Sequence, residues 1–185
     1  MKAHSPPNSE IIGKLCLKCG LCCDGSLFRD VELHPGDDAD RLKEHGLRLR
    51  KISTPDADAT PRYRFPQPCR ALGADCRCSV YKDRPGHCRA FECLLFGDVA
   101  AGRLKLPSAQ RIVSKARNLT ETVRSLLDAL GETDADAPLA ARMRRVSRDI
   151  LSGERSPDDF ARFGDLTIVY SQLTDLLARR FYRPG

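Results

Sequence analysis

The sequence predicts an α+β protein in which a small, loop-rich cysteine module is followed by a mostly α-helical C-terminal part. Two observations lead to this prediction. All nine cysteines lie between residues 16 and 93, where frequent prolines and glycines interrupt any long periodicity. After residue 104, apolar residues recur at steps of three and four, which is the spacing of one helix face. We therefore expect an N-terminal arm at 1–15, the cysteine module at 16–104 and a helical region at 105–185.

The cysteine module is expected to contain only short elements. The residue pattern predicts strands at Phe28–Leu33, at Leu47–Ile52 and around Tyr63–Phe65. Between the first two strands, the segment GDDADRLKEHG predicts a short helix, because its first turn is acidic and Gly46 can end it.

The helical region is expected to hold about three helices that pack on one another and on the cysteine module. The first has Ser108 as its N-cap and ends before Gly131. The second begins at Pro138, because proline is tolerated as a first helical residue. Ser156, followed by a proline and two aspartates, marks the start of the third, whose apolar stripe runs to Phe181. The stripe expected for the first helix is Ile112, Ala116, Leu119, Val123, Leu126 or Leu127, and Leu130.

Composition and charge narrow the class of protein. With 41% hydrophobic and 30% charged residues the chain is typical of a globular protein, and no apolar run approaches the 18 or so residues of a membrane span. The N-terminus lacks the apolar region of a signal peptide, so we expect a cytoplasmic protein. The net charge is +6, but basic and acidic residues alternate, so nucleic-acid binding is not favoured. The arginine-rich face at Arg142, Arg144, Arg145 and Arg148 is expected to be solvated.

In the cytoplasm thiols stay reduced, so a dense cysteine pattern indicates metal binding or catalysis rather than disulfides. The first cluster, C-x2-C-x2-C-C at residues 16–23, has the two-residue spacing that turns sulfurs toward one metal. Gly20 suits such a loop, because glycine allows positive φ and close approach of backbone amides. The adjacent Cys22 and Cys23 pose a problem, since neighbouring side chains in extended backbone point apart. Either the backbone is kinked there or the two sulfurs serve different metals.

The cysteine count exceeds one four-thiolate site by five, which leaves one site or two open. The spacing matches neither the full ferredoxin run nor two C-x2-C pairs of a zinc ribbon. His87 is the only histidine near the later cysteines, and we do not expect it to be a ligand.

The motifs carry a family resemblance. CxxCGxCC at 16–23 is followed by C-x-x-L at Cys69 and by CSVYKDRPGHCRAFEC at 78–93, with Tyr81, Arg84-Pro85 and Arg89 between the cysteines. This order resembles the bacterial CxxCxxCC family, also called YkgJ-like, which is a zinc- or iron-chelating domain. The resemblance covers residues 16–93. It implies metal chelation, and one branch of the family is similar to flagellin lysine N-methylases.

The resemblance also implies a ligand set, to which Cys76 is an extra. The implied ligands are Cys16, Cys19, Cys22, Cys23, Cys69, Cys78, Cys88 and Cys93. Pro85 is expected to set the entry to a short helix that carries Cys88. Arg84 and Arg89 are either structural ion-pair residues or support for the ligand loops.

Three functions follow from these observations. The first is an iron–sulfur or iron-binding protein with a redox-related role, because all-thiolate sites suit zinc or iron–sulfur centres. The second is a structural zinc module whose helical part binds a protein partner. The third is an enzyme, either related to the lysine methylases or a thiol oxidoreductase using Cys76 and Cys78. The sequence contains no G-x-G-x-x-G, no P-loop and no evident catalytic dyad, so it does not favour an enzyme and assigns no catalytic residue.

Overall fold

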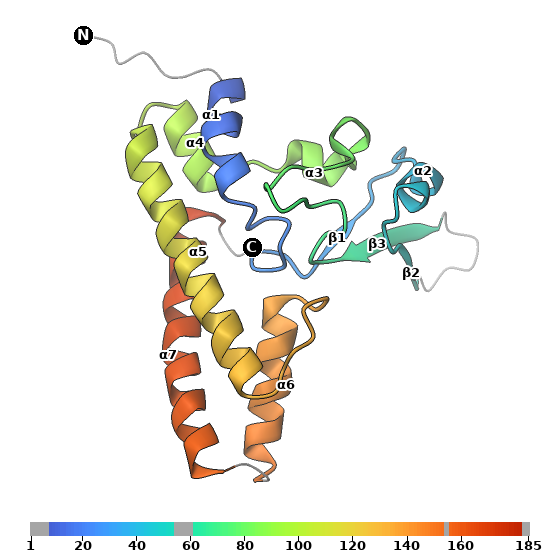
Figure 1. Ribbon diagram of the computed structural model, residues 1–185. Coiled ribbons are helices and arrows are strands. Elements are labelled where there is room, and N and C mark those ends of the chain that lie inside the picture. Colours follow the sequence, from blue (N-terminus) through green and yellow to red (C-terminus); the bar gives the residue numbers. More distant parts are fainter. Residues whose placement is uncertain (1–7, 54–60, 154–155, 183–185) are drawn as a thin grey trace. The chain divides into compact units, whose positions relative to one another are not determined.

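Helices and one small antiparallel sheet make up the regular structure of the computed structural model, which describes residues 8–53, 61–153 and 156–182 (Figure 1). The predicted α+β class is confirmed. The first seven residues of the expected N-terminal arm lie outside the described residues.

The described chain divides into two units, each built from separate stretches of sequence. The helical unit takes the chain up to Cys19, then Glu92–Asp134, and again from Leu139 onward. The cysteine–sheet unit takes Gly20–Phe91 and Ala135–Pro138.

The sheet of the cysteine–sheet unit has three short strands in the order β1-β3-β2. Strands β1 (Asp30–Glu32) and β2 (Arg50–Ile52) each pair antiparallel with β3 (Arg62–Pro66). All three lie where the sequence predicts strands, and β1 and β2 are shorter than predicted. Val31 pairs with Phe65 in the ladder, and both side chains are buried.

The core of this unit is small and is completed by cysteines. Its buried apolar residues are Val31, Leu33, Leu42, Leu47, Phe65, Ala71 and Val80. Cys69, Cys78 and Cys88 are partly buried against this group. A core of so few aliphatic side chains removes little apolar surface from water, so the thiols are part of what fills the unit.

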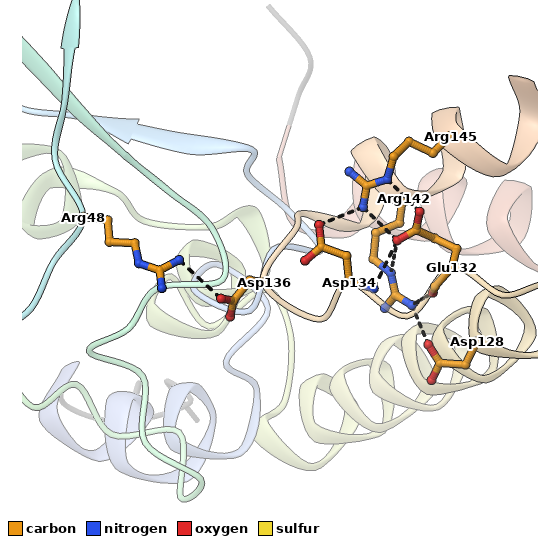
Figure 2. Close-up of polar contacts among 7 residues, drawn as sticks. All are labelled: Arg48, Asp128, Glu132, Asp134, Asp136, Arg142 and Arg145. Carbon is orange, nitrogen blue, oxygen red and sulfur yellow. Dashed lines mark hydrogen bonds and ion pairs between the residues drawn. The ribbon is translucent and has the colours of Figure 1, made fainter.

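The predicted helix after β1 is present as α2 (Ala39–Glu44). Asp38 caps it by accepting a hydrogen bond from the backbone N–H of Arg41. Gly46 follows it with a φ of +83°, a conformation that favours glycine. On the loop after α2, Arg48 lies 3.4 Å from the Asp136 carboxylate (Figure 2).

Two long helices dominate the helical unit. Helix α5 (Leu106–Ala129) and helix α7 (Pro157–Arg180) lie side by side, and the shorter α6 (Leu139–Leu151) contacts both (Figure 1). Ser156 caps α7 and forms the predicted capping box with Asp159.

The start and the buried face of α5 differ from the prediction. Ser108 is not the N-cap. The N-cap is Lys105, and the helix begins at Leu106. Pro107 fits the first turn, where no intrahelical donor is needed, so it does not delay the helix. Val113 and Thr120 are buried, whereas the predicted Ile112 and Leu119 are only half-buried. In the second helix, Pro138 immediately precedes α6 instead of opening it.

Two short helices of this unit were not predicted. Helix α1 (Asn8–Lys14) buries Ile11 fully, and helix α4 (Leu94–Ala100) buries Leu95 and Val99. Both α5 and α1 contact α4. The backbone N–H of Leu94 donates to the carbonyl of Phe181, which ties the end of α7 to the start of α4.

An ion-pair network closes the α5–α6 connection (Figure 2). Arg142 of α6 donates to the Asp128 carboxylate at 2.5 Å and to the backbone carbonyl of Glu132. Arg145 donates to the carboxylates of Glu132 and Asp134, and its hydrogen bond holds the pKa of Glu132 below the usual range. The expectation of a solvated arginine face is therefore wrong for Arg142, whose side chain is 4% exposed. None of the described helices combines the length and apolar character needed to cross a bilayer.

Candidate metal centre

Five cysteines of the cysteine–sheet unit lie within electrostatic range of one another, because the ionisation of one thiol shifts the pKa of its neighbours. They are Cys22, Cys23, Cys69, Cys78 and Cys88, and we call them the thiol cluster. They come from separate segments: the turn after Gly20, the loop after Pro68, the loop before Val80, and helix α3 (Gly86–Ala90). All five belong to the ligand set that the sequence implies.

A tight turn positions the adjacent pair Cys22 and Cys23. Gly20 has a φ of +69°, and its carbonyl accepts hydrogen bonds from the N–H groups of Cys23 at 2.8 Å and Asp24 at 3.1 Å. This kink brings the two sulfurs to 3.5 Å from each other. The sulfurs of two thiolates on one tetrahedral zinc, with bonds of about 2.3 Å, lie about 3.8 Å apart. Of the two possibilities that the sequence leaves open, the structure has the kinked backbone.

Backbone hydrogen bonds connect the other cysteine loops to this turn. The N–H of Cys69 donates to the carbonyl of Cys23 at 2.7 Å. The loop that follows folds back on itself, since Leu72 and Cys78 form an isolated β-bridge and Ser79 donates to the carbonyl of Ala71. A main-chain hydrogen bond therefore joins Cys69 to the Cys22–Cys23 turn, and the β-bridge joins Cys78 to the loop that follows Cys69.

Cys88 lies on α3, which starts immediately after Pro85 as predicted. The start of this helix is fixed by the carboxylate of Asp37, which is 4% exposed and accepts the N–H of Gly86 at 2.8 Å. The guanidinium of Arg89 lies 3.4 Å from the same carboxylate. Of the two roles expected for Arg89, the structural ion pair is the one observed.

The electrostatics of the thiol cluster favour the neutral form of Cys69, Cys78 and Cys88 as long as no metal ion is present. Burial raises the pKa of Cys69 and Cys78, and burial together with the charges of Cys69, Cys22 and Cys78 raises the pKa of Cys88 to about 12. Within the adjacent pair, the hydrogen bond between the two sulfurs lowers the pKa of Cys22 and raises the pKa of Cys23. The pair thus gives up its first proton more readily than its second.

One cation lies at the edge of the cluster. Arg84 opposes the effect of burial at Cys78 and Cys88, since its positive charge lowers the pKa of both thiols. Its guanidinium carbon lies 3.8 Å from the centre of the Tyr81 ring, in a cation–π contact. Its Nε is buried and has no hydrogen-bond partner among the described residues.

His87 packs among aromatic rings. Its imidazole meets the rings of Phe28 and His34 edge-on, with centroids 5.7 and 6.0 Å away. Burial lowers its pKa. Its Nε2 is buried and has no hydrogen-bond partner among the described residues.

Cys76 differs from the thiol cluster in its backbone. It has a φ of +60°, in the left-handed region that a residue with a Cβ rarely adopts. Its Sγ lies against Gly20, where a Cβ would stand 3.0 Å from the sulfur.

The helical unit holds the three other cysteines of the implied ligand set. Cys16 opens the 3₁₀ turn η1 (Cys16–Lys18) and Cys19 ends it. Cys93 caps helix α4, with its Sγ accepting the N–H of Phe96 at 3.3 Å. Both η1 and α4 contact α1.

The donor set of the thiol cluster fits zinc or iron, because soft sulfur ligands select these metals over magnesium or calcium. The orphaned Nε–H of Arg84 also fits, since a thiolate on a metal is an acceptor for it. In the described part of the chain, no three His, Cys, Asp or Glu side chains stand at the mutual spacing that a metal ion requires. Ligation of one metal ion by three or more of these sulfurs therefore requires them to draw closer.

Comparison with known proteins gives one result. Residues 15–115, more than half of the chain, match the model of the CxxCxxCC family, described as a "putative zinc- or iron-chelating domain". No curated protein and no solved structure matches the chain.

Proposed function

Because the chain belongs to the CxxCxxCC family, a zinc- or iron-chelating domain, we propose that it holds iron through cysteine thiolates and has a redox-related role. The observation that carries the proposal is the Cys22–Cys23 pair, whose sulfurs lie 3.5 Å apart in a unit that holds three further thiols within electrostatic range. An all-sulfur donor set suits iron and iron–sulfur centres.

The Cys22–Cys23 pair narrows the kind of iron centre. In a cubane cluster each iron takes one cysteine, whereas in a mononuclear or two-iron centre one iron takes two. Two sulfurs 3.5 Å apart are placed for a single metal ion. The pair therefore supports a mononuclear iron or a two-iron cluster over a cubane.

The chain itself supplies the thiol ligands, which must lose their protons to bind a metal ion. Each bound thiol loses its proton to solvent when the sulfur–metal bond forms. The Cys22–Cys23 pair gives up its first proton readily, because the S–H that remains donates to the thiolate beside it. When bound, iron would supply electron transfer by changing its oxidation state.

Structural zinc is the second candidate, and the same 3.5 Å pair favours it, since the spacing is close to that of two ligands on a tetrahedral ion. Here the metal would contribute folding free energy to a unit with a small core. It would take no part in chemistry, because zinc has no redox activity.

The deciding experiment is a visible absorption spectrum and elemental analysis of protein purified without oxygen or chelator. A coloured sample that contains iron supports the proposal, and acid-labile sulfide in it distinguishes a cluster from a mononuclear ion. A colourless sample with stoichiometric zinc replaces iron with the zinc candidate. Protein that takes up neither metal, even after incubation with Fe²⁺ or Zn²⁺ under reducing conditions, contradicts metal chelation by this chain.

A further inference from the structure

Arg84 is not a candidate metal ligand, but its positive charge acts on thiols of the thiol cluster. We infer that Arg84 is the positively charged N–H donor that stabilises the metal-bound thiolates, and that Tyr81 holds its guanidinium in place. The inference rests on the proposed function, because it needs thiolates on a metal. It adds a residue that is not a ligand and assigns it a positioning and charge-compensating role.

The two arginines of the second cysteine block have different surroundings. Arg89 is 55% exposed and lies 3.4 Å from the carboxylate of Asp37. Arg84 has a buried Nε, and among the described residues no carboxylate lies within ion-pair distance of its guanidinium. Arg84 stands six residues after Cys78 and four before Cys88, and its charge acts on both thiols.

The buried Nε–H of Arg84 lacks a hydrogen-bond acceptor among the described residues, and a metal-bound thiolate would supply one. A buried donor without an acceptor is unfavourable, and a neutral thiol is only a weak acceptor. A thiolate on a metal carries negative charge and accepts N–H groups far better. Arg84 is thus satisfied in the metal-bound form and unsatisfied in the thiol form, so it favours binding.

The net charge of a thiolate-bound metal centre also favours a cation at the position of Arg84. Four thiolates around one divalent ion leave a net charge of about −2 on the centre. Concentrated negative charge in a partly buried site is costly unless a cation or oriented donors compensate it. Within the described cysteine–sheet unit, Arg84 is the cation whose charge acts on Cys22, Cys78 and Cys88.

The segment that carries Tyr81 is anchored independently of the thiols. Tyr81 opens the 3₁₀ turn η2 (Tyr81–Asp83), and the carboxylate of Asp83 lies 3.0 Å from the Arg41 Nε and 3.2 Å from the His45 Nε2 of the α2 segment. The preceding residue, Val80, is buried in the core. The Tyr81 ring is 48% exposed and covers the guanidinium at 3.8 Å, so it limits the directions in which Arg84 can rotate.

The test is the Zn²⁺ affinity of three variants of the full chain, measured by competition with a chromophoric chelator between pH 6 and 8. Arg84→Met removes the charge and the donors but keeps the aliphatic stem, and Arg84→Lys restores the charge alone. Arg89→Met is the matched control, because it removes an arginine from the same block that pairs elsewhere.

We expect Arg84→Met to weaken Zn²⁺ binding by roughly tenfold to a hundredfold and to move the pH midpoint of Zn²⁺ uptake upward. Arg84→Lys recovers part of the loss, and Arg89→Met binds as the wild type does. A merely structural Arg84 would change unfolding without moving the pH midpoint. Wild-type affinity and midpoint in Arg84→Met overturn the inference and leave the proposed function standing, whereas a wild-type chain that binds neither Zn²⁺ nor Fe²⁺ overturns both.

If Arg84→Met does not fold, Tyr81→Leu carries the test, because its side chain is half-exposed and lies outside the core. We expect this variant to weaken Zn²⁺ binding less than loss of Arg84 would, with an upward shift of the same pH midpoint. An unchanged affinity and midpoint in folded Tyr81→Leu contradict the role given to the Tyr81–Arg84 contact.

Discussion

The Sγ atoms of Cys22 and Cys23 lie 3.5 Å apart, although consecutive side chains of an extended strand project to opposite sides. The turn stabilised by the Gly20 carbonyl makes this possible, since it accepts hydrogen bonds from Cys23 and Asp24. The two sulfurs therefore have nearly the spacing of two ligands on one metal ion, and the hydrogen bond between them couples their ionisation. Most of what can be tested about the centre depends on this arrangement.

Replacing either member of the pair should remove a ligand. We expect Cys22→Ser and Cys23→Ser each to lower the metal bound per chain, because a hydroxyl is a poor ligand for soft metals. The measurement is elemental analysis after anaerobic purification. Cys76→Ser is the control and should keep the wild-type metal content. Equal metal content in wild type, Cys22→Ser and Cys78→Ser would falsify the assignment of these thiols as ligands.

Gly20 should resist substitution by alanine. Its φ of +69° is unfavourable for a residue with a Cβ, and the added methyl would stand 3.0 Å from the Sγ of Cys76. We expect Gly20→Ala to lower the free energy of unfolding by about 1–2 kcal/mol. Urea denaturation with chelator and reductant present measures this without the contribution of metal.

Two further variants separate the causes at Gly20. Adding Cys76→Ala to Gly20→Ala should recover only a minor part of the loss, because it removes the contact and leaves the backbone conformation. Gly13→Ala, in helix α1, has open space around the new Cβ and should leave stability unchanged or raise it by up to about 1 kcal/mol. Equal effects at the two glycines would argue against a special role for the Gly20 conformation.

The sequence predicted the long helices and the strands because their signals are local. Ser156 and Asp159 identify the start of α7 from a few residues, and the apolar stripe carries it to Phe181. Helix α4 escaped prediction because LLFGDVA is too short an apolar run for its period to be recognised. The start of α5 was misplaced because Ser108 resembles a cap, whereas Pro107 already belongs to the first turn.

The parts of the candidate site that sequence could not predict depend on tertiary contacts. The implied ligand set contains all five members of the thiol cluster. The spacing alone does not predict that the backbone N–H of Cys69 donates a hydrogen bond to the carbonyl of Cys23. It does not separate Arg84 from Arg89 either, because the difference lies in Asp37, about fifty positions away in the chain. Likewise, the burial of Arg142 follows from acceptors on another helix and its loop.

Metal binding should release protons, and affinity should therefore rise with pH. Cys69, Cys78 and Cys88 have raised pKa values, which are caused mainly by burial, so they are neutral thiols near pH 7. Each must lose its proton to bind, so Zn²⁺ affinity increases from pH 6 to pH 8. Calorimetric titrations in buffers of different ionisation enthalpy count the protons released. An affinity independent of pH would mean that the ligands are ionised before the metal arrives.

The stability of the metal-free chain should depend on pH in the opposite direction. The pKa of Cys88 is about 12 in the folded chain and about 8.5 when unfolded, so folding favours the protonated thiol. Its contribution to stability is complete below about pH 8.5 and is lost as the pH rises toward 12. We expect a lower urea midpoint at pH 10 than at pH 8 with chelator present, and a smaller decrease in Cys88→Ala. The same decrease in both proteins would assign the effect to other groups.

Arg142 should be the most sensitive arginine of helix α6. Its side chain is 4% exposed and donates to the Asp128 carboxylate and the Glu132 carbonyl, so Arg142→Met leaves two acceptors without their donor. Asp128 is 56% exposed and water can replace part of the loss, so we expect a decrease of roughly 1–3 kcal/mol in the free energy of unfolding. Arg148→Met, on the same helix and exposed, should change it by less than about 0.5 kcal/mol. If urea denaturation gives the two variants the same stability, the network drawn in Figure 2 does not hold the α5–α6 connection.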